Sequence, residues 1–311
     1  MSAEVETMAF SGEIPWHGLG VEVLDCLTPK EMMVAASLDW TVSKSPLFTR
    51  VNGEEITLSD KVLIRDSDAS ILSIVGEDWV PNQNAHAFEF FTEFTEKGGM
   101  KMHTAGSLKG GRHVWALAKL EKNFTLFNGD RVEGYLLFSN PHQYGMCIDV
   151  RFTAVRVVCN NTLTAALSGK ANQIFKSSHR VTLDLDVVKE TIGLAKKKLD
   201  KYEELAQFLG SVRYTDENIG EFFEELFPSM STKDEAKKSR NFKQAMLALT
   251  HQPGIEFAPG TFWQAVNAVS YVTDHIMARE RDTRVYNMWY GSTQVLKQKA
   301  MKLAEEFAKR S

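Results

Sequence analysis

Tight-turn signals between β-type runs constrain the fold of this chain most strongly. The paired glycines of Lys109-Gly110-Gly111-Arg112 separate the runs Lys101–Leu108 and His113–Leu120. Paired glycines supply the positive φ that a tight hairpin needs. Asn52-Gly53 and Asn128-Gly129 are turn signals of the same kind. The first 180 residues are therefore predicted to contain an antiparallel β-meander.

Two helices are predicted within this mixed part of the chain. After an irregular beginning, Thr28-Pro29 has the character of an N-cap and a first helical residue, so we expect a helix over Lys30–Ser37. Asn84–Glu96 follows a helical pattern of apolar residues. The other β-type runs are bounded by turn residues and are Trp40–Arg50, Lys61–Arg65, Ser70–Val75, Tyr135–Ser139 and Met146–Val158.

The pattern becomes helical after residue 181. Apolar periodicity predicts helices over Asp184–Phe208, Ile219–Leu226, Thr261–Arg281 and Thr293–Lys309, with a polar loop over Pro228–Arg240. We therefore predict an α+β protein, with an antiparallel β-meander and packed helices over residues 1–181 and an all-helical region over residues 182–311. The last helix is expected to expose three lysines on its solvated face, namely Lys297, Lys299 and Lys302.

Composition excludes several classes of protein. The chain has 311 residues, of which 43% are apolar and 24% charged, as in ordinary folded proteins. No apolar run reaches the ~18 residues that a membrane span needs, and the N-terminal residues lack the basic and apolar regions of a signal peptide. Three scattered cysteines fit neither a disulfide framework nor a zinc site. We therefore expect a protein of a reducing cytoplasm that does not associate with membranes.

Sequence signatures of catalysis and of metal binding are missing. The chain contains no C-x-x-C, H-E-x-x-H or G-x-S-x-G motif. Gly106–Arg112 lacks the G-K-[ST] of a phosphate-binding loop, although a basic glycine hairpin can still contact phosphates. We therefore predict no catalytic residue, no metal ligand and no cofactor.

The charge distribution is much less even than the net charge of −4 implies. Residues 1–96 hold 5 bases and 17 acids, a net charge of −12, whereas residues 97–180 hold 12 bases and 4 acids, a net charge of +8. The remainder holds 19 of each. Such a basic middle segment indicates either an anionic partner or neutralisation by the acidic segment, within a subunit or between subunits.

The stretch Arg151–Leu163 concentrates groups that bind anions. Arg151 and Arg156 face opposite sides of a strand because their separation is odd, so one of them is expected among apolar neighbours in a paired or ligand-holding role. Asn160-Asn161-Thr162 then predicts the start of a short helix through Leu167, where backbone amides attract anions. A satisfied arginine followed by a helix cap is the alternative interpretation.

Five motifs in order along the chain resemble those of a family associated with phages and plasmids and catalogued as a domain of unknown function. They are Pro15-Trp16-His17-Gly18-Leu19-Gly20, Ser37-Leu38-Asp39-Trp40, Val75-Gly76 followed by Trp79-Val80-Pro81-Asn82-Gln83-Asn84, Arg156 to Leu163, and Gly260-Thr261-Phe262-Trp263. The resemblance implies a mobile-element protein in a bacterial host cytoplasm and carries over no catalytic residue. The order of a meander, a basic sheet region and a helical tail also looks like that of ring-forming phage single-strand annealing proteins. The net negative charge of this chain differs from what is usual for a protein that binds long DNA.

The leading hypothesis is a non-catalytic, homo-oligomeric protein that binds single-stranded DNA in phage recombination or replication. Bases interleaved with aromatic residues suit the phosphates and stacked bases of a single strand. The predicted nucleic-acid contacts are Lys101, Lys109, Arg112, Arg151, Arg156, Asn160, Asn161, Lys170, Lys176 and Arg180.

Two alternatives remain open at this point. The first is an enzyme on a small anionic ligand such as a nucleotide, whose pocket would be lined by Arg156, Asn160, Asn161 and one of His103, His113 or His142. The second is a structural or host-interaction protein, in which the charge asymmetry only builds a homo-oligomer.

Overall fold

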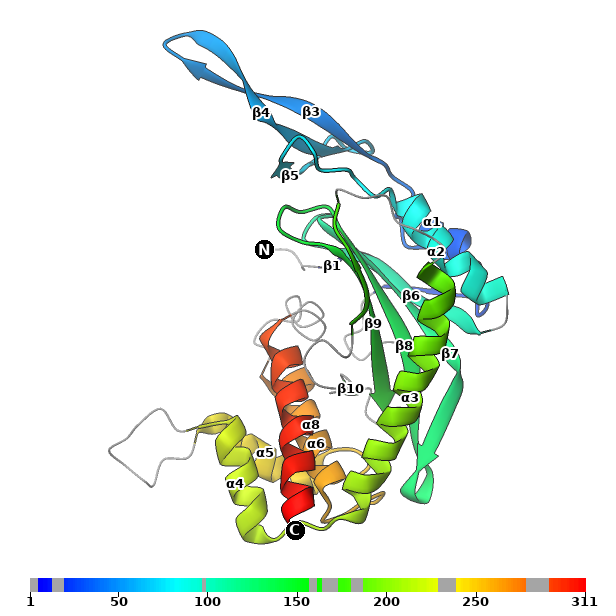
Figure 1. The fold of residues 1–311 in the computed structure, drawn as a ribbon, viewed down its shortest axis with the longest axis vertical. Helices are drawn as coiled ribbons and strands as arrows, with labels where there is room; N and C mark the ends of the chain where they lie inside the picture. The colour runs from blue at the N-terminus through cyan, green and yellow to red at the C-terminus, as the bar shows by residue number, and fades with distance from the viewer. Residues whose placement is uncertain are drawn as a thin grey trace. The chain divides into compact units, whose positions relative to one another are not determined.

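The computed structural model describes residues 5–12, 20–96, 99–156, 161–163, 173–179, 187–228, 239–277 and 291–311. Two β-sheets lie in the N-terminal half of the chain, and helices fill the C-terminal half (Figure 1). The predicted fold class, an α+β protein with a β-meander followed by a helical region, is therefore confirmed.

The larger sheet contains the β6–β7 hairpin predicted around Gly110-Gly111. Leu108 lies opposite His113, and Lys109, Gly110 and Gly111 have φ values of 56°, 65° and 82°. Glycine tolerates this left-handed conformation without a steric penalty. The strand order is β10-β9-β8-β7-β6-β1-β2, with β11 paired to β9. The strands are β1 (Val5–Ser11), β2 (Val21–Val23), β6 (Met100–Leu108), β7 (His113–Leu126), β8 (Asp130–Pro141), β9 (Ile148–Arg156), β10 (Asn161–Leu163) and β11 (Gln173–Ser177).

The smaller sheet has the order β3-β4-β5 and comprises β3 (Val42–Val51), β4 (Glu54–Arg65) and β5 (Ile71–Val75). The β3–β4 turn falls at Asn52-Gly53, as the sequence predicts. Helix α1 (Pro29–Ala35) has the predicted N-cap, because the Thr28 side chain accepts a hydrogen bond from the Glu31 backbone and the Glu31 carboxylate accepts one in return.

Helix α2 (Asn84–Glu96) has the predicted bounds and packs aromatic side chains into the core. The rings of Phe90 and Phe91 lie 5.2 and 5.7 Å from the ring of Phe138 on β8. This packing fixes the middle of α2 against the larger sheet.

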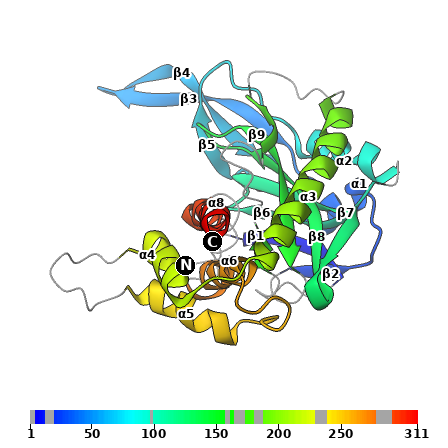
Figure 2. The ribbon, with the colours of Figure 1, turned by 60° about the horizontal axis from the view of Figure 1, so that its bottom comes forward.

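The C-terminal helices form a second core. Figure 2 shows α4, α5, α6 and α8 grouped together, and the aromatic rings of Phe222, Phe262 and Phe307 meet edge to face or tilted within this group. The helices are α3 (Val187–Ser211), α4 (Asp216–Leu226), α5 (Arg240–His251), α6 (Phe262–Tyr271) and α8 (Ser292–Arg310), with the short helix η1 (Phe127–Gly129) and the π-helix η3 (Val272–Ile276). No helix in the described ranges has the length and hydropathy of a membrane span.

The chain divides into two compact units whose residue ranges interleave. Unit 1 comprises Met1–Glu121, Leu136–Arg151 and Gln173–Leu194, and unit 2 comprises Lys122–Tyr135, Phe152–Asn172 and Ala195–Ser311. The predicted domains, residues 1–181 and 182–311, follow the change from mixed to helical structure and remain a prediction.

Helix α5, which begins where the polar loop was expected to end, was not predicted. Three local predictions are wrong. Strands β1 and β2 replace part of the irregular beginning. Strand β4 begins at Glu54 rather than Lys61. Asn161–Leu163 is strand β10, paired antiparallel with β9 so that Asn161 lies opposite Arg156, and not the first turn of a helix. In each case pairing or packing with a distant segment overrides the local propensity.

Candidate functional site

The loop before α2 is fixed by a buried network of asparagine side chains in unit 1. The Asn82 side-chain amide donates to Asn140 Oδ1 at 3.1 Å, and the Asn140 amide donates to the Asn82 carbonyl at 2.9 Å. The Asn84 amide donates to the carbonyls of Leu38 and Trp40 at 3.0 and 3.4 Å. The motif Trp79–Asn84 is thus tied to the end of β8 and to residues 38–40.

His142 belongs to the same network and is fully buried. Its Nε2 lies 3.0 Å from Asn84 Oδ1, an acceptor, so Nε2 carries the proton. Its backbone N–H donates to the Arg112 carbonyl at 2.8 Å, which joins the end of β8 to the β6–β7 hairpin. Its Nδ1 is buried and has no hydrogen-bond partner among the described residues.

Two further buried histidines lie near His142. His113, at the start of β7, meets Ser139 Oγ at 2.7 Å through its Nε2. The His179 ring stacks on Trp79, with ring centroids 4.1 Å apart and planes at 19°, and the Val80 N–H donates to the His179 carbonyl at 2.6 Å. We refer to His113, His142 and His179 as the histidine cluster.

Burial keeps the histidine cluster uncharged at neutral pH. Desolvation, reinforced by the charges of Lys109 and Arg151, lowers the pKa of His113 to about 3. Desolvation also lowers the pKa of His142 to about 3 and that of His179 to about 4. These histidines therefore hold the site together and add no positive charge to it at pH 7.

Positive charge at this end of unit 1 comes from lysine and arginine instead. Lys109 and Arg112 belong to the β6–β7 hairpin tip, Arg151 lies on β9, and Lys176 lies opposite Asp149 on β11. Lys109 and Arg151 both lie close enough to His113 to lower its pKa. Arg112 and Lys176 are exposed. We call Lys109, Arg112, Arg151 and Lys176 the basic end of the sheet.

Arg151 has the paired role that its position on the strand predicts. Its Nε and Nη2 donate to the two carboxylate oxygens of Asp149 at 2.9 and 2.7 Å, and a quarter of its side chain is exposed. Burial raises the pKa of Asp149, and the Arg151 guanidinium opposes that rise. Arg151 is therefore a satisfied arginine that keeps one edge open to solvent.

An exposed aromatic side chain lies in the loop that connects β8 and β9. Tyr144 is 69% exposed, and its backbone N–H donates to Ser73 Oγ at 3.2 Å. This loop follows His142, so it lies at the same end of the sheet as the Arg112 hairpin. Tyr144 was not among the contact residues predicted from the sequence. Its place in a polar loop between two predicted strands could have indicated an exposed aromatic side chain.

The structure separates the predicted contact residues into three groups. The basic end brings Lys109, Arg112, Arg151 and Lys176 together. Lys101 is exposed at the opposite end of β6, eight residues or roughly 26 Å from Lys109 at 3.3 Å per residue. Arg156 and Asn161 are paired backbone positions on β9 and β10, so the helix start predicted at Asn160-Asn161-Thr162 is wrong at Asn161, whereas Arg156 lies on a strand as predicted. Asn160, Lys170 and Arg180 lie outside the described residues.

The enzyme alternative gains no support from the histidines that it invoked. His113 and His142 are 1% and 0% exposed, and His103 Nδ1 lies 2.6 Å from its neighbour Thr104 Oγ1. Among the described residues, no group of three or more His, Cys, Asp and Glu side chains could hold a metal ion.

A second buried polar contact lies in unit 2 and corrects the prediction for the last helix. Lys297 Nζ donates to Asp274 Oδ1 of the π-helix at 2.8 Å, and the two side chains are 2% and 0% exposed. Lys297 therefore faces the core, whereas Lys302 is exposed as predicted. The sequence signal for this buried ion pair was Asp274, an aspartate within the apolar run Thr261–Arg281.

Comparison with known proteins identifies the family of the chain. No curated protein and no solved structure matches it. The model of the family described as a domain of unknown function, DUF932, matches residues 71–298. This range contains the Trp79–Asn84 loop, the histidine cluster and the basic end. The chain is therefore a member of the DUF932 family.

Proposed function

We propose that the protein binds single-stranded nucleic acid, DNA in the first place, at the basic end of the larger sheet. The observation that carries the proposal is the convergence of Lys109, Arg112, Arg151 and Lys176 from a hairpin tip and two strands. Cations on separate elements can contact successive phosphates without reading sequence.

Tyr144 supplies the second component that a single-strand site needs. Bases of a single strand stack on exposed aromatic rings, and this stacking is unavailable to a paired duplex. The histidine cluster and the asparagine network beneath hold the hairpin, the β8–β9 loop and β11 in fixed positions. The proposed surface is thus preorganised and not assembled by its ligand.

The motif resemblance supports a biological setting for this proposal. A phage or another mobile element would supply the protein, and it would act in recombination or replication in the cytoplasm of a bacterial host. Annealing of complementary strands by a homo-oligomer is the activity proposed within that setting.

The test is fluorescence anisotropy of a labelled strand of about 40 nucleotides, long enough to span several phosphate-contact sites. Wild-type protein should bind with an affinity that falls steeply as salt rises. Arg112→Glu and Lys176→Glu should each weaken binding about tenfold and reduce the salt dependence by about one phosphate contact. Tyr144→Ala should weaken single-strand binding about tenfold with a smaller effect on duplex, because it removes stacking only.

Lys101→Glu is the matched control, since it makes the same charge change on an exposed residue at the other end of β6. It should weaken binding much less than Lys176→Glu. The proposal fails if wild-type protein does not bind at low salt, or if Arg112→Glu and Lys176→Glu bind as tightly as wild type.

A further inference from the structure

The distal half of the β3–β4 hairpin is exposed on every side. Every residue from 48 to 60 is exposed, and only residues 61–64 of β4 pair with β5. In both overall views the ribbon extends beyond the other elements of unit 1 (Figures 1 and 2). An isolated two-stranded hairpin is marginally stable in water, so this segment needs a covering partner. We call the part of the hairpin from Leu47 to Asp60 the arm.

One face of the arm is mainly aliphatic, and the other combines Phe48 with polar and charged residues. The register pairs Leu47 with Leu58, Thr49 with Ile56 and Val51 with Glu54. Paired residues share a face, as do residues two apart on a strand, so these six lie on one face. Val51, Ile56 and Leu58 are 50%, 45% and 37% exposed. The opposite face carries Phe48, Arg50, Glu55 and Thr57.

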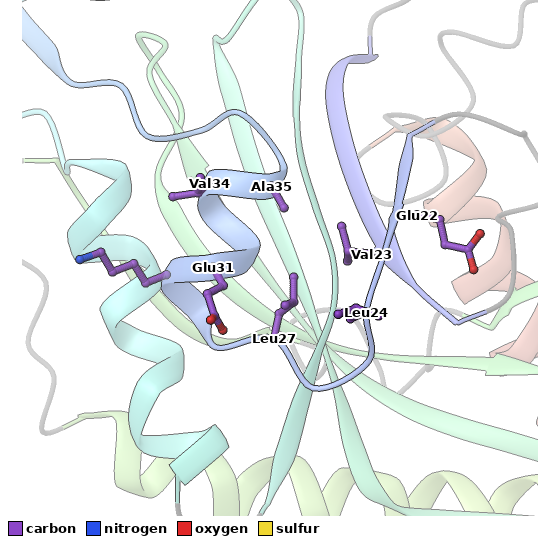
Figure 3. A pocket seen from close by; sticks show the side chains of 8 residues that line it. Glu22, Val23, Leu24, Leu27, Glu31, Val34 and Ala35 are labelled. Atoms are coloured by element: carbon purple, nitrogen blue, oxygen red, sulfur yellow. The ribbon is translucent and has the colours of Figure 1, made fainter.

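An apolar groove lies elsewhere on unit 1, between β2 and helix α1 (Figure 3). It encloses about 770 Å³, within the size range of sites that bury a ligand. Five aliphatic side chains line it, namely Val23, Leu24, Leu27, Val34 and Ala35. Leu24 and Val34 are 81% and 52% exposed, so the groove is open to an incoming apolar side chain.

One pair of opposite charges is available to join the two surfaces. Glu54 is the only charged residue on the aliphatic face of the arm, and the groove is lined by one base, Lys30, and by two acids, Glu22 and Glu31. Neither Glu54 nor Lys30 makes an ion pair within the described part of the chain, whereas Glu31 is already engaged in the cap of α1. A carboxylate at the arm tip and an ammonium at the groove can therefore pair when the apolar surfaces meet.

We propose that the aliphatic face of the arm of one copy docks into the groove between β2 and α1 of a second copy, with Glu54 pairing with Lys30. The two surfaces differ, so the contact is heterologous and joins copies head to tail, as a closed ring or an open chain. This assembly does not depend on nucleic acid, so it stands or falls separately from the proposed function.

The test is sedimentation velocity of the full chain without nucleic acid, from about 1 μM to about 100 μM, the range of modest homomeric affinities. Wild-type protein should assemble. Ile56→Glu in the arm and Val34→Glu in the groove should each raise the dissociation constant roughly tenfold or more, because each places an unpaired carboxylate against apolar side chains. Thr57→Glu is the matched control, since it adds the same charge to an exposed neighbour on the other face.

A mixture of the two defective variants gives the decisive result. The intact arm of Val34→Glu can enter the intact groove of Ile56→Glu, so an equimolar mixture should form a dimer and nothing larger. Glu54→Lys should weaken assembly, and adding Lys30→Glu to it should restore assembly. All of these positions are exposed, and circular dichroism should show that each variant is folded.

Four outcomes would overturn the proposal. These are wild-type protein that stays monomeric at every concentration, Ile56→Glu that assembles like wild type, Thr57→Glu that disrupts assembly as much as Ile56→Glu, and a mixture that stays monomeric.

Discussion

At the scale of single residues, burial decides which polar groups hold the site and which can meet a ligand. His113, His142 and His179 have strongly lowered pKa values because the protein excludes water from their rings. Arg112 and Lys176 lie at the same end of unit 1 but remain exposed. An anion that approaches this end at pH 7 therefore meets the charged side chains of Arg112 and Lys176, whereas the buried histidines carry no charge.

The lowered histidine pKa values predict a loss of stability in mild acid. Below the unfolded pKa of 6.5 the unfolded chain binds more protons than the folded chain, until the pH reaches about 4 for His179 and about 3 for the other two. Stability that is fully present above pH 6.5 is then lost as the pH falls, by up to about 1.4 kcal/mol per pH unit for each histidine. Urea unfolding at about pH 7.5, 6 and 5 measures this slope.

A substitution within the histidine cluster provides the control for that measurement. His179→Gln removes one of the three lowered pKa values and should therefore reduce the slope of unfolding free energy against pH. A slope near zero between about pH 6 and pH 5 would show that the cluster is protonated without cost in the folded protein.

The buried pair Lys297–Asp274 predicts a large effect of a single substitution. Lys297→Met should lower the free energy of unfolding by about 3–5 kcal/mol, because it leaves the buried Asp274 carboxylate without its lysine. Adding Asp274→Asn should recover much of that loss, since it removes the buried negative charge. Lys302→Met, at an exposed position on the same helix, should change stability by less than about 0.5 kcal/mol. Thermal or urea unfolding of the four proteins checks the order.

At the scale of elements, the close approach of β1 to β6 depends on one glycine. A Cβ at Gly106 would lie 2.4 Å from the Thr7 carbonyl oxygen. The obstacle is backbone, so it cannot rotate away. Gly106→Ala should therefore lower the free energy of unfolding by roughly 2–3 kcal/mol, in the range of overpacked cores.

Gly76→Ala is the matched control, because a Cβ there has no atom within 4 Å. It should change stability by less than about 0.5 kcal/mol in the same urea titration. Equal stability of the two variants would mean that β1 moves away from β6 at little cost.

Elements with local signals were predictable, and elements that depend on distant partners were not. The Gly110-Gly111 hairpin and the capped helix α1 follow from turn and cap chemistry within a few residues. Strand β1 pairs with β6, about a hundred residues away, and no local sequence pattern predicts that pairing. Asn161 has the residue type of a helix cap, but its pairing with Arg156 makes it part of a strand.

The same distinction explains what could be predicted of the candidate site. The sequence identified the basic segment, and Lys109, Arg112, Arg151 and Lys176 do converge. The sequence could not exclude Lys101 from the site. The end of the sheet at which a residue lies depends on how the strands are ordered, and the sequence does not show that order. The network of buried asparagines was missed because a polar side chain at the end of an element or in a loop is usually exposed, and only the fold shows that Asn82, Asn84 and Asn140 contact one another.

At the scale of the whole molecule, the two proposed surfaces use different physical forces. The basic end relies on cations that release counterions from a nucleic-acid strand, and this attraction weakens steeply with salt. The arm and groove rely mainly on apolar burial, which added salt does not weaken. The charge split between residues 1–96 and 97–180 therefore need not drive assembly.

This difference predicts opposite responses of one sample to salt. With about three phosphate contacts per subunit, raising salt tenfold should weaken single-strand binding about 100-fold. The sedimentation coefficient of the protein alone should stay constant over the same range, apart from a small loss from the Glu54–Lys30 pair, which is exposed and screened. Anisotropy and sedimentation of one preparation at about 50 and 500 mM salt measure both responses. If assembly and binding weaken together, attraction between the acidic and basic segments holds the oligomer. The arm and groove would then be free for another partner.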